Sequence, residues 1–357
     1  VKRGSKSMRI VVDAMGTDAR PTPDVIGAAR ASQEYSIDVI LVGDSSKINE
    51  VLSRTRLQSS RISVVHAPDQ ISMTDKPSQV MRSKSDSSMH VGMQLVKNGE
   101  ADAFVTMGNT GAAHAIATLS VLHRIPKVRR PALTALYRVQ DQPMIFLDMG
   151  ANADSKPEWL QQFGLMGAIY AETVLNLENP RVATLCNGEE EGKGNELTRQ
   201  AQALMHQLHL NYVGHVEPKE LLEGKADVIV VDGFVGNIFL KTFEASISYF
   251  ADVIRQEVKK SWYSSLGALL MRPALRNVRQ RLDTGEIGGA PLLGVNGVVI
   301  IGHGRADEHA VQNAINQARL AAQAHIVTKI VEGMQSLDAR SEGLEIHRHD
   351  KIGRAHV

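Results

Sequence analysis

The chain has 357 residues, of which 43% are hydrophobic and 22% are charged. Forty Lys and Arg residues nearly balance 39 Asp and Glu residues, so no basic surface is indicated and no nucleic-acid partner is expected. Cys186 is the only cysteine, which excludes an intramolecular disulfide and favours a reducing, cytoplasmic compartment. No apolar run reaches the roughly 18 residues that a membrane-spanning helix needs.

The two ends of the chain are expected to lie outside the fold. Residues 1–7 precede Met8, where a strand pattern begins at once, and they are interpreted as a non-native or disordered extension. From about Ser336 the apolar periodicity stops, and 336–357 is interpreted as a disordered tail that is partly artefactual. Residues 8–335 are therefore predicted to form a single α/β domain.

Short apolar runs alternate with segments of helical period along this domain. Pro23 is placed to start a helix over 23–35, and Gly99 to end one over 85–100. Segments that read as a strand followed by a glycine loop, and two further strands, occur at 8–16, 37–44, 61–68, 101–111, 143–152, 181–192, 226–237 and 296–304. The strands are continuous apolar runs, so both faces of their sheet are expected to be covered. The pattern predicts an α/β fold, a three-layer sandwich around a mostly parallel sheet.

Six of the predicted strands end in a loop that contains Gly, mostly together with Asn or Asp. These loops read "DAMGTD", "MGNTG", "DMGAN", "NGEEEGKGN", "DGFVGN" and "GHGRAD". In an open parallel sheet the ligand sits at the carboxyl ends of the strands. A single such loop is typical of a tight turn, but six of them indicate a binding crevice that all six are expected to face.

Residues 238–282 break the alternation, because they contain helical patterns and no strand. Their middle is apolar and is flanked by Lys and Arg; the apolar residues are Leu266, Leu269, Leu270 and Met271. An apolar tip with a basic surround is typical of a protein that rests on anionic lipid. A helix pair at a dimer interface has the same pattern, and the two interpretations are compatible.

The loop "GEEEGKGNE" at 188–196 resembles a nucleotide P-loop but lacks its spacing. A P-loop has four residues between its glycines and a Ser or Thr after the lysine, whereas three residues separate Gly188 from Gly192, and Gly194 follows Lys193. Backbone N–H groups at the start of a helix, together with one lysine, suit a single small anion. The three glutamates, 189–191, are expected to hold Lys193, to cap the following helix or to face away.

The other loops supply neutral hydrogen-bond donors, namely Asn109, Thr110, Asn152 and Asn237. His303 and His114 are the histidines best placed for proton transfer, although a lone histidine near a loop is more often structural. Cys186 is interpreted as a small core residue rather than a thiol nucleophile. No set of His, Cys and Glu has the spacing of a zinc site, and no metal is expected.

A basic element lies in "KPSQVMRSKSDSSM" and contains Lys76, Arg82 and Lys84. Three cations before and at the start of a helix could meet an acidic partner. The same pattern also occurs on an ordinary solvated face, and the residues alone leave both readings open.

Eight motifs in order resemble the acyl-acyl-carrier-protein:phosphate acyltransferases of bacterial phospholipid synthesis. They are "VDAMG", "KPSQVMRSKSDSSM", "GNTGA", "GANADSKPEWLQQF", "GEEEGKGNEL", "DGFVGN", "LKTFE" and "GGAPLLGVNGVVIIGHG", and they extend the resemblance over 8–331. The resemblance implies transfer of a long fatty acyl group from acyl-carrier protein to inorganic phosphate without a cofactor. The acyl phosphate would then serve a membrane glycerol-3-phosphate acyltransferase.

The resemblance also implies an architecture and a location. The fold would be related to isopropylmalate dehydrogenases and phosphotransacetylases, with 238–282 as a protruding helical hairpin. The enzyme would be a cytoplasmic homodimer, peripherally associated with the inner face of an anionic membrane through the apolar tip.

The resemblance further suggests roles for individual residues. The phosphate is expected at Lys193 and at the backbone of Gly188, Gly192, Gly194, Gly108 and Gly111. The thioester carbonyl is expected near Asn109, Thr110, Asn237 and His303. The acidic carrier protein is expected at Lys76, Arg82 and Lys84.

The sequence departs from the family pattern at three places. Thr17 stands where a second glycine is usual, Cys186 where the family has no thiol, and Arg305 where small polar residues are common. Three rival functions stay open at this stage: an acyl-coenzyme A enzyme of the phosphotransacetylase kind, an NAD-dependent dehydrogenase on the same fold, and a non-catalytic membrane scaffold. Against the dehydrogenase, the sequence has no G-x-G-x-x-G motif with a later ribose-binding acid.

Overall fold

The computed structural model describes residues 7–55, 57, 59–140, 142–190, 192–282 and 288–338. Its strands are β1 (Arg9–Asp13), β2 (Asp38–Gly43), β3 (Ile62–His66), β4 (Ala103–Thr106), β5 (Ala132–Val139), β6 (Gln142–Leu147), β7 (Arg181–Leu185), β8 (Asn211–Val216), β9 (Val228–Val230), β10 (Ala290–Leu293) and β11 (Val298–Ile301). They form one sheet in the order β3-β2-β1-β4-β11-β10-β5-β6-β9-β7-β8.

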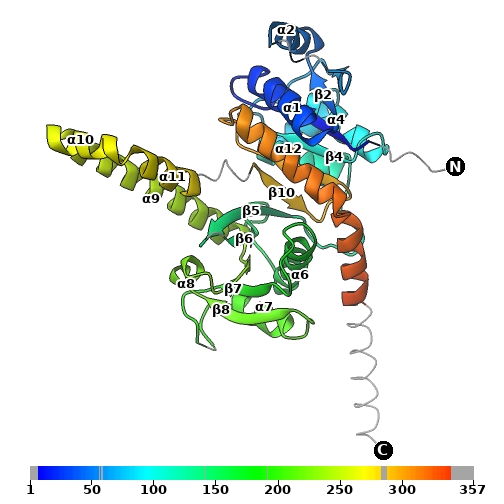
Figure 1. Cartoon of the computed structure of the whole chain (residues 1–357). Helices are drawn as coiled ribbons and strands as arrows, with labels where there is room; N and C mark the ends of the chain where they lie inside the picture. The colour runs from blue at the N-terminus through cyan, green and yellow to red at the C-terminus, as the bar shows by residue number, and fades with distance from the viewer. Residues whose placement is uncertain are drawn as a thin grey trace, which may run out of the picture.

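The helices cover the sheet and extend beyond it (Figure 1). They are α1 (Thr22–Tyr35), α2 (Ser45–Thr55), α3 (Pro77–Ser83), α4 (Ser88–Lys97), α5 (Thr110–Ala115), the π-helical turn η1 (Ile116–Ser120), α6 (Pro157–Thr173), α7 (Glu196–Met205), α8 (Pro218–Leu222), α9 (Gly233–Lys259), α10 (Trp262–Leu270), α11 (Arg272–Leu282) and α12 (Glu308–Gln323). A further helix covers 326–338. It passes the predicted domain end at 335, and Leu337 packs against the core.

Both faces of the sheet are buried, as the continuous apolar strands predict. In β4, Val105 belongs to the core cluster beneath α1 and α12, whereas its neighbour Phe104 belongs to the cluster beneath α4 and α5. In β9, Val230 faces the side of α6, and Ile229 faces the side to which Phe239 of α9 contributes. Successive residues of a strand point to opposite faces, so this division shows a helical layer on each side. The predicted three-layer α/β fold with a mostly parallel sheet is confirmed.

The direction of the strands reverses in the middle of the sheet. β1, β2, β3, β4 and β11 are parallel to one another, and so are β6, β9, β7 and β8. Between the two sets, the pairings β11–β10, β10–β5 and β5–β6 are all antiparallel. Three successive reversals make the second set run opposite to the first.

This reversal corrects one expectation from the sequence. The six glycine loops do not form one row along a single edge of the sheet, because the carboxyl ends of the two strand sets point in opposite directions. The loops after β1, β4 and β11 form one group, and those after β6, β9 and β7 form another. The sequence patterns did not predict β5 and β10, the two strands that cause the reversal. They did not predict β8 either.

Candidate active site

The loop after β1 and the GNTG turn after β4 are locked together by a buried carboxylate. Asp13 is 1% exposed, and it accepts hydrogen bonds from the Thr106 hydroxyl at 2.7 Å and the Met15 N–H at 3.0 Å. Burial raises the pKa of Asp13, and these hydrogen bonds oppose the rise. The Gly108 N–H donates to the same threonine hydroxyl at 3.0 Å. The sequence predicts that the backbone of Gly108 binds phosphate. In the structure the Gly108 N–H is buried and already donates to Thr106.

A second buried carboxylate lies behind this loop. Asp24 is fully buried in α1, and it accepts from the Thr17 hydroxyl at 2.5 Å and the Thr17 N–H at 3.3 Å. Burial raises the pKa of Asp24 to about 8. Thr17, the residue that departs from the family pattern, thus closes its loop with a hydrogen bond of its own.

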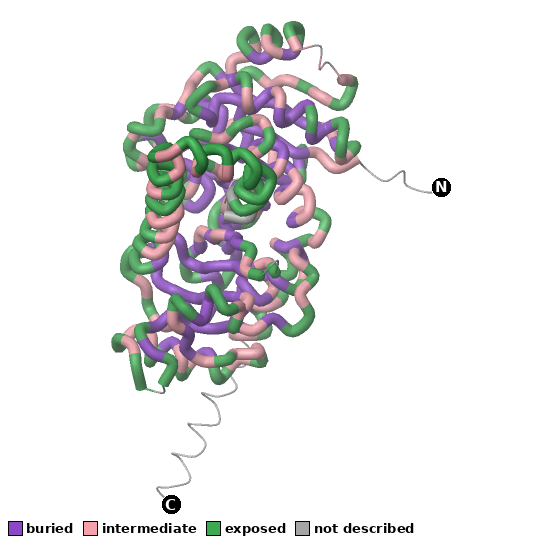
Figure 2. Tube along the Cα trace, turned by 60° about the vertical axis from the view of Figure 1, so that its left-hand side comes forward, coloured by how far each residue is buried: buried purple, intermediate pink, exposed green. Residues whose placement is uncertain are grey.

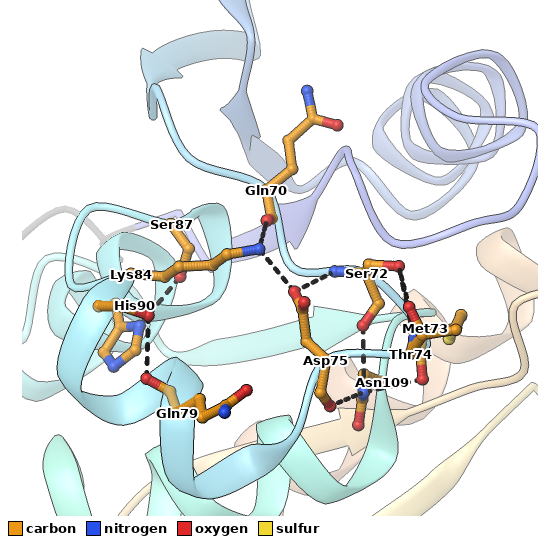
Figure 3. Close-up of polar contacts among 11 residues, drawn as sticks. Gln70, Ser72, Met73, Thr74, Asp75, Gln79, Lys84, Ser87, His90 and Asn109 are labelled. Atoms are coloured by element: carbon orange, nitrogen blue, oxygen red, sulfur yellow. Dashed lines mark hydrogen bonds and ion pairs between the residues drawn. The ribbon is translucent and has the colours of Figure 1, made fainter.

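Asn109 organises the GNTG turn through both the oxygen and the nitrogen of its side-chain amide, and Figure 3 shows the contacts of the nitrogen. Its oxygen caps α5 by accepting the N–H of the third helical residue at 3.0 Å. Its nitrogen lies within 3.0–3.1 Å of the carbonyl oxygens of Ser72, Met73 and Asp75. The predicted thioester donor is therefore engaged within the protein, where it fixes the turn that presents Thr110.

The segment 69–76, which we call the strap, lies against this turn. Its Met73 reaches Gly304, where an added Cβ would collide with the Met73 methyl group. The Gly304 carbonyl also accepts the Asp18 N–H at 2.7 Å. Exposed Thr110 and His303 therefore belong to one neighbourhood, with the strap between them. Gly111 borders it too, because a Cβ there would lie 3.0 Å from the Pro77 ring.

The three predicted carrier-binding cations differ in their surroundings. Lys76 and Arg82 are exposed. Lys84 is half-buried, and its ammonium donates to the Asp75 carboxylate at 2.5 Å and to the Gln70 carbonyl at 2.8 Å (Figure 3). The Lys84 ammonium holds the pKa of Asp75 below its usual range. Lys84 is therefore bound to the strap, whereas Lys76 and Arg82 are exposed, and the assignment of the three cations to the carrier protein stays a prediction.

The second loop group is built around Asp148, which is fully buried at the end of β6. It accepts the backbone N–H of Leu133, Gly150, Ala151 and Asn152 at 2.7–3.3 Å and the Asn152 amide at 2.8 Å. Burial raises its pKa, and the hydrogen bonds oppose the rise. These partners make Asp148 an anchor of its own loop.

Helix α9 begins directly against the 148–152 turn. Asp232 caps the helix by accepting the N–H groups of its second and third residues at 3.0–3.1 Å. A Cβ at Gly233 would lie 2.5 Å from the Asn152 carbonyl, and one at Gly236 would collide with the Asp148 carbonyl. Only glycine permits this approach, which leaves Asn237 exposed beside Gly150.

The segment leading into β5 links the two groups. The Asn152 amide donates to the Pro131 carbonyl at 2.8 Å, in the second group. Arg130, one residue earlier, lies near enough to His114 of α5 to lower its pKa, although burial is the larger cause. The GNTG helix and the Asp148 turn therefore flank the same segment, in spite of the opposite strand directions.

The acidic loop after β7 has a different construction, dominated by exposed ion pairs. The Lys193 ammonium lies 3.9 Å from the Glu190 carboxylate, and the Lys193 stem lies over Gly188, where a Cβ would be 2.8 Å from its Cγ. Gly192 and Gly194 have φ angles of 94° and 87°, which few other residues adopt. The hypothesis that a glutamate holds Lys193 agrees with the Glu190 contact, whereas the cap of α7 is Asn195.

A second glutamate of this loop has a partner from another element. The Glu189 carboxylate lies 3.8 Å from the Lys225 ammonium, which also contacts Glu220 of α8. Contact with Glu220 raises the pKa of Glu189, and the Lys225 charge opposes this. Two of the three glutamates thus have cationic partners; the third, Glu191, lies outside the described residues. Cys186 is 8% exposed, which agrees with the interpretation as a core residue.

The first turns of α9 pack against the sheet through Phe239 and Phe243. Beyond them α9, α10 and α11 extend away from the sheet as a helical arm (Figure 1) whose residues are mostly exposed (Figure 2). The predicted tip residues are exposed by 51% to 77%: Leu266, Leu269, Leu270 and Met271. Trp262 and Tyr263, beside them, are 77% and 67% exposed. The helical nature of 238–282 is confirmed. In the described part of the chain, no helix has the length and apolarity to cross a bilayer, and no cluster of three potential metal ligands occurs.

Comparison with protein families gives the class. Residues 8–329 match the family described as fatty acid synthesis protein, and the chain belongs to this family. Similar curated proteins are the phosphate acyltransferases of Alkaliphilus oremlandii, with 44% identity over 92% of this chain and 98% of the relative, and of Dictyoglomus turgidum, with 42% over 94% and 100%. The protein of Syntrophotalea carbinolica, with the same description, is 42% identical over 90% and 92%.

Solved structures support the fold. A phosphotransacetylase from Streptococcus pyogenes superposes with a TM-score of 0.60 over 90% of this chain and 95% of its own, at 18% identity. The EutD phosphotransacetylase from Staphylococcus aureus gives 0.58 over 89% and 94%, also at 18% identity. The family and the fold together define an enzyme, an acyltransferase of fatty acid and lipid synthesis.

Proposed function

We propose that the enzyme transfers a long-chain fatty acyl group from the thioester of acyl-carrier protein to inorganic phosphate. The product, an acyl phosphate, feeds phospholipid synthesis through a membrane glycerol-3-phosphate acyltransferase. The observation that carries the proposal is the full-length similarity to phosphate acyltransferases at above 40% identity. The loops are compatible with it, because they supply neutral donors, an exposed lysine and glycine backbone.

The reaction needs few groups. A phosphate oxygen attacks the thioester carbonyl carbon, the carbonyl oxygen becomes an oxyanion, and the carbon–sulfur bond then breaks. The thiolate that leaves takes up a proton, so atoms and charge balance without a metal or a cofactor. Donors near the carbonyl stabilise the oxyanion. Exposed Thr110 and Asn237 are assigned to this role, Asn109 caps the helix that begins at Thr110, and exposed His303 is assigned to move the proton.

Phosphate is assigned to the acidic loop, at Lys193 and the backbone of Gly188, Gly192, Gly194 and, in the other group, Gly111. Lys193 is 54% exposed, and its contact with Glu190 is long at 3.9 Å, so a phosphate dianion could replace the carboxylate there. Arg305 is a rival cation, since it is exposed on the same turn as His303.

The test is the phosphate dependence of acyl phosphate formation from palmitoyl-carrier protein. We expect Lys193→Ala to raise the phosphate KM by about tenfold or more, as loss of a charge-assisted contact implies. Lys219→Ala is the matched control, because Lys219 is 83% exposed and pairs only weakly with Glu223 at 3.6 Å. If Lys193→Ala leaves the phosphate KM unchanged and Arg305→Ala raises it, the phosphate site must be assigned to the first loop group, beside His303.

Parallel assays separate the rival functions. Palmitoyl-coenzyme A in place of the carrier tests an enzyme of the phosphotransacetylase kind, and NAD tests a dehydrogenase. A scaffold without catalysis would form no acyl phosphate from either palmitoyl-carrier protein or palmitoyl-coenzyme A. Exposed Lys76 and Arg82 are assigned to the acidic carrier protein, so their removal is expected to raise its KM at low salt.

The exposed arm is assigned to homodimer contact and to peripheral binding at the cytoplasmic face of an anionic membrane. Its exposed apolar residues support this assignment. A chain with Leu269→Asp and Leu270→Asp should float less with anionic liposomes than the unaltered chain. Equal flotation would contradict the assignment of the tip to lipid.

A further inference from the structure

Lys84 differs from its basic neighbours because both of its hydrogen bonds point back into the protein. Its ammonium is 2.5 Å from the Asp75 carboxylate and 2.8 Å from the Gln70 carbonyl (Figure 3). The Lys84 and Asp75 side chains are only 30% and 27% exposed. Lys76 and Arg82, by contrast, are exposed.

Both partners of Lys84 belong to the strap. Asp75 also accepts the Ser72 N–H at 2.8 Å, which closes a turn within the strap. On the other side, the Asn109 amide contacts the carbonyls of Ser72, Met73 and Asp75. The strap is therefore fastened twice, by Lys84 from the end of α3 and by Asn109 from the start of α5.

The charge of Lys84 is compensated by a carboxylate at close range. A cation that is already paired contributes little attraction to an acidic protein surface, and breaking the pair would cost both hydrogen bonds. The pair is shorter and less exposed than the Glu190–Lys193 contact of the acidic loop. Lys84 is thus better suited to hold the strap than to meet a partner.

We propose that Lys84 is a positioning residue, which holds the strap against the GNTG turn through Asp75 and Gln70. The strap in turn keeps Asn109, and with it Thr110, in the orientation that the thioester requires. The inference rests on the proposed function, because it takes this turn as the thioester site.

Two variants decide between positioning and carrier docking, because the two roles predict opposite effects of Asp75→Asn relative to Lys84→Met. If Lys84 docks the acidic carrier, Lys84→Met weakens carrier binding, while Asp75→Asn removes a repelling charge and leaves binding equal or stronger. If Lys84 positions the strap, both variants loosen the same contact and act in the same direction.

We expect Lys84→Met and Asp75→Asn each to lower kcat by about five- to tenfold, with little change in the carrier KM. The double variant should be no slower than the slower single variant, since both changes break one contact. The loss should persist at high salt, where docking effects of Lys76→Met fade. Lys97→Met is the matched control, because Lys97 is exposed on α4 away from the strap.

A raised carrier KM in Lys84→Met, together with an unchanged or lowered one in Asp75→Asn, would overturn the proposal in favour of docking. Activity equal to the unaltered enzyme in both variants would overturn it as well. Asp75→Asn keeps the test valid should Lys84→Met fail to fold.

Hydrogen exchange separates this inference from the proposed function. Backbone amides of the strap, above all that of Ser72, should exchange faster in both variants whichever acyl donor the enzyme uses. Unchanged exchange of these amides sinks the inference even if acyl phosphate is formed. Faster exchange without acyl phosphate formation by the unaltered enzyme would uphold the strap contact and reject the function.

Discussion

The strap region and the acidic loop both rely on a lysine beside a carboxylate, but the two pairs differ in kind. Lys84 and Asp75 are 2.5 Å apart and mostly covered, and backbone carbonyls and N–H groups complete their contacts. Lys193 and Glu190 are 3.9 Å apart and are 54% and 67% exposed. A short, covered pair fixes a structure, whereas an exposed, long pair is screened by water and salt. The strap region is therefore held more firmly by its lysine than the acidic loop is.

Asn109→Ala should have the largest effect on stability in this comparison. It removes the cap of α5 and the donors to three strap carbonyls, so we expect a loss of about 3 kcal/mol in the free energy of unfolding. Urea unfolding measures it. Asn109→Asp keeps the cap acceptor but sets a carboxylate oxygen against the three strap carbonyls, so it should lose at least as much. A loss under about 1 kcal/mol for Asn109→Ala would mean that the strap region is no more tightly held than the acidic loop.

Asp24→Asn should change the pH dependence of stability. The pKa of Asp24 is raised to about 8, so between pH 4 and 8 the folded protein holds a proton that the unfolded chain has released. This contribution to stability is present at low pH and is lost as the pH rises towards 8. Asparagine cannot ionise and can still hydrogen-bond to Thr17. Relative to the unaltered protein, Asp24→Asn should therefore gain about 2 kcal/mol between pH 6 and pH 8.

The measurement for Asp24→Asn is denaturant unfolding at pH 6, 7 and 8 for both proteins. Asp13, whose pKa burial also raises, should leave some pH dependence in the variant. Parallel stability curves for the two proteins would show that Asp24 is not protonated in the fold.

Glu190→Gln should have the smallest effect on stability, within about 0.5 kcal/mol, because the pair it breaks is long and exposed. The same urea experiment as for Asn109→Ala measures it. A cost comparable to that of Asn109→Ala would erase the difference between the two regions, and the acidic loop would then be a rigid element.

Most of the layer structure could be predicted from the sequence, because each buried strand carries its own local signal. The apolar runs at 37–44 and 61–68 became β2 and β3, and Pro23 lies in the first turn of α1. The strands that the patterns missed, β5, β8 and β10, are short, mixed with polar residues or placed at an edge. β5 also pairs with the adjacent β6 and β10 with the adjacent β11, whereas the pairing of β10 with β5, as between Leu292 and Leu133, joins segments far apart in the sequence. The reversal needs all three antiparallel pairings, and the one between β10 and β5 depends on a distant contact that no local pattern reveals.

The candidate site shows the same limit at the level of side chains. The sequence indicated the glycine loops, which stay a prediction, but it gave no sign that Lys84 is paired, because its partner Asp75 lies nine residues earlier in a non-helical segment. The spacing of Ser72 and Asp75, a serine followed three residues later by an acid, is the local signal that could have indicated a closed turn. The engagement of Asn109 depends on how the strap folds back, which spacing alone does not give.

Helix α9 is also a mechanical element. Its 27 residues extend about 40 Å, from the 148–152 turn to Lys259, just before α10, which carries the apolar tip. At its near end, Gly233 and Gly236 leave no room between the helix and the carbonyls of that turn. With no slack there, a tilt of the distant arm must displace the turn beside Asn237 or be resisted by it. A force on the tip would therefore be transmitted through α9 to the loops of the second group.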